Sequence, residues 1–170
     1  MRKSFKAVHI LGLSLFLGSI GVYIALTTQH LAPGTPAFAE LRHQILVGTQ
    51  CITLPGLLTT IASGLGLLWV NRHQMQRWQI AKTLVGCLLL LNTWLLVAPA
   101  IRSAADLSAT AVFSQGSPGE LASALRIETV AGAANVLLAC LSILLAVFRP
   151  RLGQPRMIGR LSLSEAKTGT

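Results

Sequence analysis

Few side chains in this 170-residue sequence could do chemistry, and His9 is the first of them. It follows the basic residues Arg2, Lys3 and Lys6 and stands near the start of an apolar stretch that extends to Thr28. A neutral imidazole at this position can hydrogen-bond to lipid headgroups or to a carbonyl. It can equally serve as an axial ligand of haem or another metalloporphyrin. Both interpretations of His9 stay open from the residue alone.

Lys82 lies one turn inside another apolar stretch, which begins at Trp78. Its side chain either extends to the membrane surface or pairs with a propionate or another anionic substrate. His73 and Met75, in the polar segment just before this stretch, are weak candidates for a second axial ligand. We expect all four of these side chains, His9 included, to lie at a similar depth on one side of the bundle.

Glu128 lies in the last apolar stretch, two residues after Arg126, so the two side chains point in different directions on a helix. A carboxylate there must find a partner inside the bundle, because lipid offers it no hydrogen bond. We expect this partner to be a basic side chain of another helix: Arg42, Arg102 or His43. The pair is either structural or handles protons, so Lys82 and Glu128 are the candidate catalytic residues.

Composition indicates an integral membrane protein. The chain is 52% hydrophobic and only 11% charged, with a mean hydropathy of +0.64. Soluble domains carry about a quarter charged residues. The net charge of +9 could suggest a nucleic-acid partner, but the charges lie between apolar stretches and form no basic face beside aromatic residues. We therefore expect the lipid bilayer, and no nucleic acid, as a partner.

The three cysteines, Cys51, Cys87 and Cys140, fall in three different apolar stretches with no metal-finger spacing. We expect each to be a small buried apolar residue, with no disulfide framework. The sequence contains no nucleophile triad, phosphate-binding loop or paired-carboxylate motif.

The elements that must position these residues are four transmembrane helices, expected at residues 5–28, 42–70, 78–101 and 121–148. Each is long enough to cross a bilayer. The expected fold is an all-α integral membrane bundle over residues 1–150, and residues 151–170 form a basic tail. Pro55 should kink the second helix. Pro99 should end the third helix, and residues 102–120 should form a connector.

Basic residues predict the orientation of the bundle. Eleven of the fourteen lysines and arginines lie near the N-terminus, around residues 72–82, or in the tail. Because cytoplasmic loops carry the excess of positive charge, both termini should be cytoplasmic.

Helical periodicity predicts which faces pack. On the first helix, one face is made of small residues that favour close helix approach, and an opposite face carries His9 and Phe16. The small residues are Ser14, Gly18, Gly21 and Ala25. On the last helix, an inward face should carry Glu128, Ala131, Asn135, Ala139 and Ser142. We see no internal repeat.

Several motifs in order resemble those of the HemJ-type protoporphyrinogen oxidases and the related CopD family of bacterial membrane proteins. The first motif is the segment 5–12, FKAVHILG, followed by His30. The second is Arg42 ahead of the Pro55-Gly56 kink. The third and fourth are the segment 78–82, WQIAK, and the closing segment 144–150, LLAVFRP. The chain departs from the oxidases at Thr93, where they have a histidine, and it lacks their Asn-Glu-x-Pro motif.

This resemblance implies a bacterial inner-membrane protein with a haem b or porphyrin site at His9, and with Lys82 and Arg42 as further cofactor-binding residues. It implies a redox role, either protoporphyrinogen oxidation on a porphyrin substrate or electron transfer. One alternative is a non-catalytic subunit or structural partner, in a homo-oligomer or a larger membrane complex. A weaker alternative is CopD-like copper transport.

Overall fold

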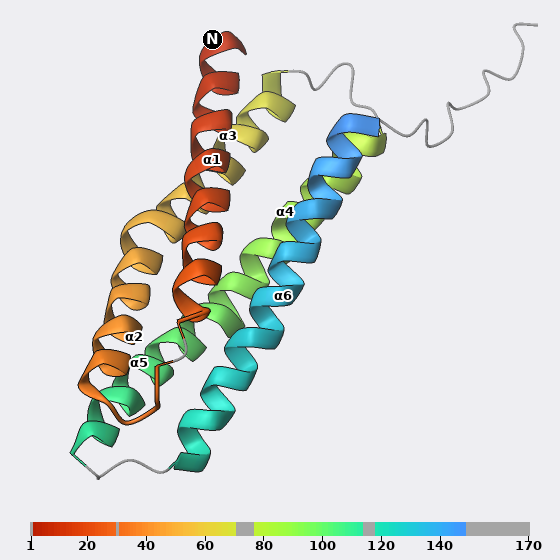
Figure 1. The fold of residues 1–170 in the computed structure, drawn as a ribbon. Coiled ribbons are helices and arrows are strands. Elements are labelled where there is room, and N and C mark those ends of the chain that lie inside the picture. Colours follow the sequence, from red (N-terminus) through yellow and green to blue (C-terminus); the bar gives the residue numbers. More distant parts are fainter. Residues whose placement is uncertain (1, 30, 71–76, 114–117, 149–170) are drawn as a thin grey trace, which may run out of the picture.

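A computed structural model of the chain describes residues 2–29, 31–70, 77–113 and 118–148, and every regular element in these segments is helical. The order along the chain is α1, α2, the π-helical segment η1, α3, α4, the π-helical segment η3, α5 and α6 (Figure 1). Their bounds are Arg2–Thr27, Pro36–Gly48, Thr49–Thr53, Leu54–Val70, Arg77–Asn92, Thr93–Val97, Ala98–Val112 and Pro118–Phe148.

Because η1 joins α2 to α3 and η3 joins α4 to α5, these elements form four long helices, each apolar and long enough to cross a membrane. They cover Lys3–Thr27, Pro36–Val70, Trp78–Val112 and Pro118–Phe148. The prediction of an all-helical chain with four such helices is confirmed for the described residues. The tail 151–170 lies outside them, as do His30, His73 and Met75.

Two predicted boundaries are wrong. The second long helix begins at Pro36, before residue 42, because the Thr35 side chain caps its N-terminus and proline is tolerated in the first turn. The third does not end at Pro99 but continues to Val112. Residues 102–112, expected in a connector, are rich in alanine, the strongest helix former. They also bury Ala104, Ala105 and Ser108.

Each of the two 35-residue helices has a π-helical joint just before a proline. Leu54, which precedes Pro55, donates its N–H to the carbonyl of Thr49. Ala98, which precedes Pro99, donates to Thr93 in the same way. Since proline cannot donate a helical hydrogen bond, the wider turn ahead of it absorbs the interruption. The predicted kink at Pro55 is therefore this joint, and Pro99 has a matching one.

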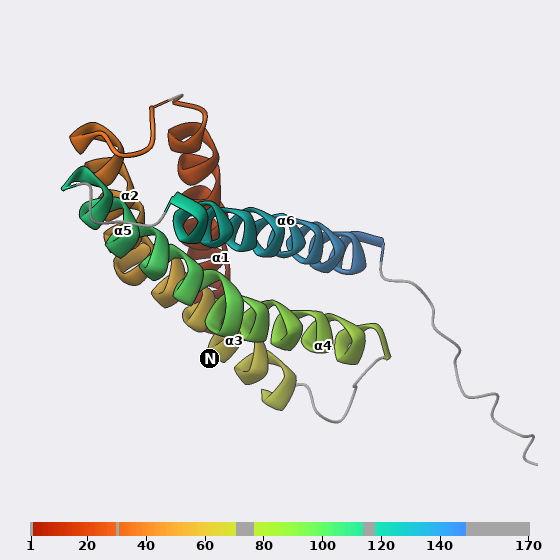
Figure 2. The same cartoon turned by 90° about the horizontal axis from the view of Figure 1, so that it is seen from below.

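The helices are arranged differently at the two ends of the bundle. At one end, α1 packs against α3 and α4 packs against α6, and these two pairs diverge (Figure 1). At the other end, α5 packs against both α2 and α6, as Figure 2 shows from below. We call the first the His9 end, made by α3, α4, the first half of α1 and the last half of α6. The second is the Arg42 end, made by α2, α5 and the start of α6.

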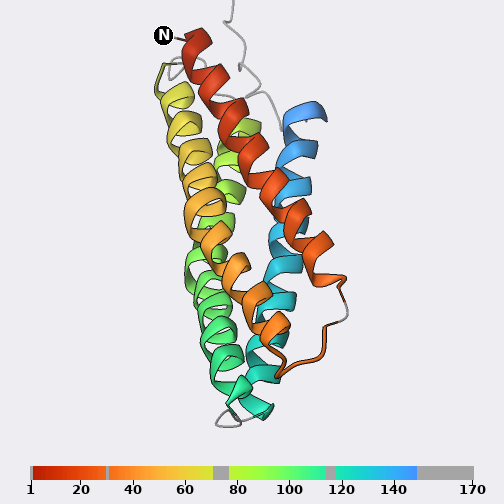
Figure 3. The same ribbon diagram turned by 60° about the vertical axis from the view of Figure 1, so that its left-hand side comes forward.

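Two clusters of buried side chains hold the bundle. One lies at mid-height and joins Phe16 of α1 to Leu57 of α3, Leu89 of α4 and Ala139 of α6. The other joins Leu41 and Ile45 of α2 to Ile101 of α5. The first cluster ties the two diverging helix pairs together, because Phe16 and Leu57 belong to one pair and Leu89 and Ala139 to the other. Figure 3 shows α1 in front of α6 in that view.

The face of small residues on α1 does not pack against any described residue of another helix, contrary to the expectation from its composition. Ser14, Gly18, Gly21 and Ala25 are all exposed, and nothing lies within 4 Å of a Cβ added at Gly18 or Gly21. The face that carries Phe16 is the buried one, because its glycine at position 12 allows closer contact with α3.

Candidate functional site

A cavity of about 580 Å³ opens between the two helix pairs at the His9 end. Its size is in the range of small-molecule sites, which extends from about 300 to 1,000 Å³. Its floor is the mid-height apolar cluster, through Leu57, Leu89 and Ala139. Its polar and basic lining includes His9, Lys82, Lys6 and Gln79. The cavity therefore combines apolar walls with a few polar groups, as ligand sites do.

His9 is held by α3 through one ring nitrogen. Nδ1 lies 2.8 Å from the carbonyl oxygen of Thr60 and 3.1 Å from Oγ of Ser63. A carbonyl can only accept a hydrogen bond, so Nδ1 carries the proton and Nε2 keeps its lone pair. Among the described residues, none hydrogen-bonds to Nε2. A histidine fixed in this way has the tautomer and the orientation of a metal ligand.

Two glycines bring α1 close enough to α3 for this contact. A Cβ added at Gly12 would lie 2.8 Å from Oγ1 and 2.9 Å from N of Thr60. A Cβ added at Gly56 would lie 3.0 Å from N of Phe16. Because neither position has room for a side chain, the backbones touch and the Thr60 carbonyl comes within reach of His9. Gly64, which lines the cavity, leaves space beside the imidazole ring.

Lys82 lines the cavity from α4 and is half-buried. Gly86, one turn further along α4, also lines it, and nothing lies within 4 Å of a Cβ added there. The prediction that His9 and Lys82 lie at the same end is confirmed, since both face one cavity although 73 residues separate them. His73 and Met75 precede this helix in the segment 71–76, outside the described residues.

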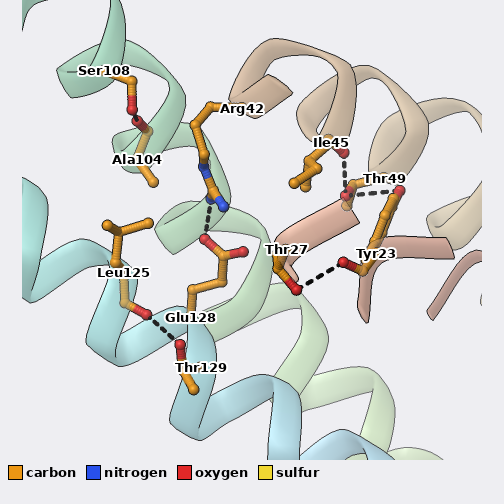
Figure 4. Close-up of polar contacts among 10 residues, drawn as sticks. All are labelled: Tyr23, Thr27, Arg42, Ile45, Thr49, Ala104, Ser108, Leu125, Glu128 and Thr129. Carbon is orange, nitrogen blue, oxygen red and sulfur yellow. Dashed lines mark hydrogen bonds and ion pairs between the residues drawn. The ribbon is translucent and has the colours of Figure 1, made fainter. Parts of the chain in front are cut away.

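Arg42 is at the opposite end of the bundle and does not line the cavity. It forms an ion pair with Glu128 of α6, and its side chain is 3% exposed, against 16% for Glu128 (Figure 4). Of the three partners expected for Glu128, the structure has Arg42, and Arg102 and His43 are exposed. Nε of Arg42 is buried without a hydrogen-bond partner among the described residues.

A cluster of hydroxyl groups that we did not expect links α1 to the first joint. Thr49 donates to the Tyr23 hydroxyl at 3.1 Å, and the same hydroxyl lies 3.0 Å from Oγ1 of Thr53 (Figure 4 shows the first contact). Thr53 also donates to Ser19. At both joints a threonine stands six residues before the proline: Thr49 before Pro55, and Thr93 before Pro99. This spacing is the sequence signal from which the joints could have been predicted.

The second joint has an amide cluster of similar character. Asn135 of α6 donates to Oγ1 of Thr93 at 2.8 Å and accepts from Asn92 at 2.7 Å. Asn92 also donates to the carbonyl of Ala131. The predicted inward face of α6 is confirmed, because Ala131, Asn135 and Ala139 are buried. Thr93 is 1% exposed and fully occupied by these contacts, with its own hydroxyl bonded to Leu89.

The cysteines are not buried, contrary to our expectation. Cys51, Cys87 and Cys140 are free and exposed on three different helices, where the outer surface is apolar and a small thiol fits as readily as in a core. Among the described residues, no three His, Cys, Asp or Glu side chains come together as a metal site would require. A haem needs no such group, because one histidine can hold its iron.

Comparisons with protein-family models, with curated proteins and with solved structures find no match to this chain. The case for a function therefore depends on the cavity and its side chains.

Proposed function

We propose that this chain is a multi-pass protein of the bacterial inner membrane that binds haem b or a related porphyrin in the cavity at the His9 end. His9 would hold the haem iron, and Lys82 would hold an acidic group of the porphyrin. The observation that carries the proposal is the fixed imidazole of His9, with Nδ1 bonded to the Thr60 carbonyl and Nε2 unbonded beside an apolar cavity.

The residues around the cavity fit such a group. His9 offers a neutral nitrogen, and the Thr60 contact increases the basicity of that nitrogen and fixes its direction. The floor made by Leu57, Leu89 and Ala139 excludes water from the deep part of the cavity. Haem, when bound, supplies one-electron redox chemistry. The finer proposal is that this chemistry serves electron transfer or the oxidation of a reduced porphyrin.

The same proposal includes the orientation of the chain. With both termini in the cytoplasm, the His9 end faces the cytoplasmic side and the Arg42 end faces outward. The supporting evidence is the distribution of basic residues. A reporter enzyme that functions only in the cytoplasm should be active when it is fused after Thr170. Activity of a reporter that functions only in the periplasm, fused at the same position, would reverse the assignment.

The first experiment is an absorption spectrum of the purified protein, oxidised and reduced, from haem-replete cells. We expect a Soret band and reduced b-type α-bands in the wild type and their loss in His9→Ala. His43→Ala is the matched control, because His43 is exposed and belongs to α2 at the opposite end. A colourless wild type, or an unchanged spectrum in His9→Ala, would reject haem ligation by His9.

A second candidate function, a non-catalytic subunit of a membrane complex, is favoured by the exposed small-residue face of α1. Gly18 and Gly21 have no neighbour among the described residues that requires a glycine, whereas in lipid such a face suits close approach of another helix. Under this alternative, the wild type is colourless and co-purifies with a partner. That partner is lost when Gly18 and Gly21 are changed to leucine.

A further inference from the structure

The ammonium group of Lys82 makes no hydrogen bond or ion pair with any described residue, although the side chain is half-buried in the cavity wall. A charge in apolar surroundings is costly unless an opposite charge or several hydrogen bonds compensate it. The described lining of α3 and α6 supplies no charge. It is mostly apolar, as at Leu68, Ile143 and Ala146, and its only side-chain polar groups are the hydroxyls of Thr60 and Ser142.

Lys6 lines the same cavity from α1, one turn before His9. α1 belongs to one of the two diverging helix pairs and α4 to the other, so Lys6 and Lys82 approach the cavity from its two sides. Sequence reasoning used Lys6 only as a topology signal, because its position relative to Lys82 depends on the tertiary fold.

Among the residues that the structure describes, no acidic side chain lines this cavity. The chain has five acidic residues, and four of them belong to elements of the Arg42 end. These are Glu40 of α2, Asp106 of α5, and Glu120 and Glu128 at the start of α6. The fifth, Glu165, lies outside the described residues. The half-buried Lys82 and the exposed Lys6 therefore share a cavity with no described carboxylate, and an anionic ligand there would be within the lining of both.

We propose that the cavity selects ligands that carry two carboxylates on one edge of an apolar body, with one carboxylate held by Lys6 and the other by Lys82. This inference rests on the proposed function. It adds that the site recognises the number and the placement of the acidic groups on its ligand. The apolar body lies toward the floor formed by Leu57 and Leu89, and the acidic edge lies toward the open end of the cavity.

The test uses iron-free porphyrins, whose binding needs no axial ligand. Purified full-length protein in lipid nanodiscs is titrated with mesoporphyrin, which has two propionates, and with its dimethyl ester, and binding is followed by porphyrin fluorescence. We expect the wild type to prefer the diacid, and Lys6→Met and Lys82→Met each to weaken diacid binding about tenfold. Binding of the diester should not change in either variant.

Methionine is a suitable replacement because it keeps a long unbranched side chain without the charge. Lys3→Met is the control, since Lys3 is an exposed lysine of the same helix that does not line the cavity, and it should bind like the wild type. Equal binding of diacid and diester by the wild type would overturn the inference. So would an equal loss for both ligands in the lysine variants, or no binding of either porphyrin.

This outcome is independent of the test of haem ligation. A lysine-dependent preference for the diacid in a protein that is purified without haem would support the inference and reject His9 as an iron ligand. A haem spectrum that is lost in His9→Ala, together with equal binding of diacid and diester, would support His9 as an iron ligand and reject the inference about the two lysines.

Discussion

The Arg42 end and the His9 end of this bundle treat their charged side chains in opposite ways. At the Arg42 end, a nearly fully buried arginine of α2 is paired with a carboxylate of α6, and α5 packs against both of these helices. At the His9 end, two helix pairs diverge, and Lys82 faces a cavity without a described partner. Under the proposed function, the Arg42 end stabilises the bundle and the His9 end binds a ligand. Four changes test this division, in order of their expected effect on stability.

The largest effect should follow the loss of one partner of the Arg42–Glu128 pair. Glu128→Ala leaves a buried guanidinium without its counter-charge, and we expect the free energy of unfolding to fall by about 3 kcal/mol or more. The measurement is thermal or denaturant unfolding in detergent. The double variant Arg42→Met with Glu128→Leu should recover most of the loss. If Glu128→Ala were neutral, the Arg42 end would not have the stabilising role.

The next effect should come from the contact between α1 and α3. Gly12→Ala places a methyl group within 3 Å of two Thr60 atoms, so the helices must separate, at a cost of about 1–3 kcal/mol. Because the separation also moves His9 away from the Thr60 carbonyl, porphyrin binding should weaken in the same variant. Gly18→Ala, at a position with nothing within 4 Å, should leave both stability and binding unchanged.

A smaller effect should follow Asn135→Leu, which removes the hydrogen bonds to Asn92 and Thr93 at the second joint. Interhelical hydrogen bonds in membrane proteins contribute about 0.6 kcal/mol each, so we expect a loss of about 1 kcal/mol. Thr129→Val on the same helix is the control, because the Thr129 hydroxyl bonds only within α6. A loss as large as that of Glu128→Ala would show that the joint is as important as the ion pair.

The smallest effect on stability, and the clearest effect on binding, should come from filling the cavity. Gly86→Leu extends into open space, so stability should be unchanged or slightly higher, since leucine is a better helix former than glycine. Porphyrin binding, measured by fluorescence or by the Soret band, should be abolished. Gly132→Leu, at another open position outside the cavity, should bind normally. Normal binding by Gly86→Leu would place the ligand elsewhere.

Sequence reasoning predicted the parts of this fold that depend on local composition. Four long apolar stretches gave four long helices, and helical periodicity placed Asn135 and Ala139 on the buried face of α6. Depth along the helices also placed His9 with Lys82 and Glu128 with Arg42 at opposite ends. These inferences succeed because rise and rotation per residue are fixed properties of a helix.

The predictions that failed share one physical cause: tertiary packing overrides the local preference of the sequence. Pro99 stops an isolated helix, but the joint ahead of it and the burial of Ala104 and Ala105 carry the helix onward. The glycine that matters for α1 packing is Gly12, and the longer row of small residues stays exposed. Which face of a helix is buried depends on the partner surface, and the periodicity of one helix contains no information about that surface.

The two proline-jointed helices are also longer than a bilayer is thick. Each has 35 residues, which corresponds to about 52 Å at 1.5 Å per residue, against a hydrocarbon layer of about 30 Å. A tilt of about 20° shortens their span by only a few ångströms. In a membrane, part of these two helices must therefore stand outside the hydrocarbon, among the headgroups or in water. Bilayer thickness then determines how much of their length is wetted.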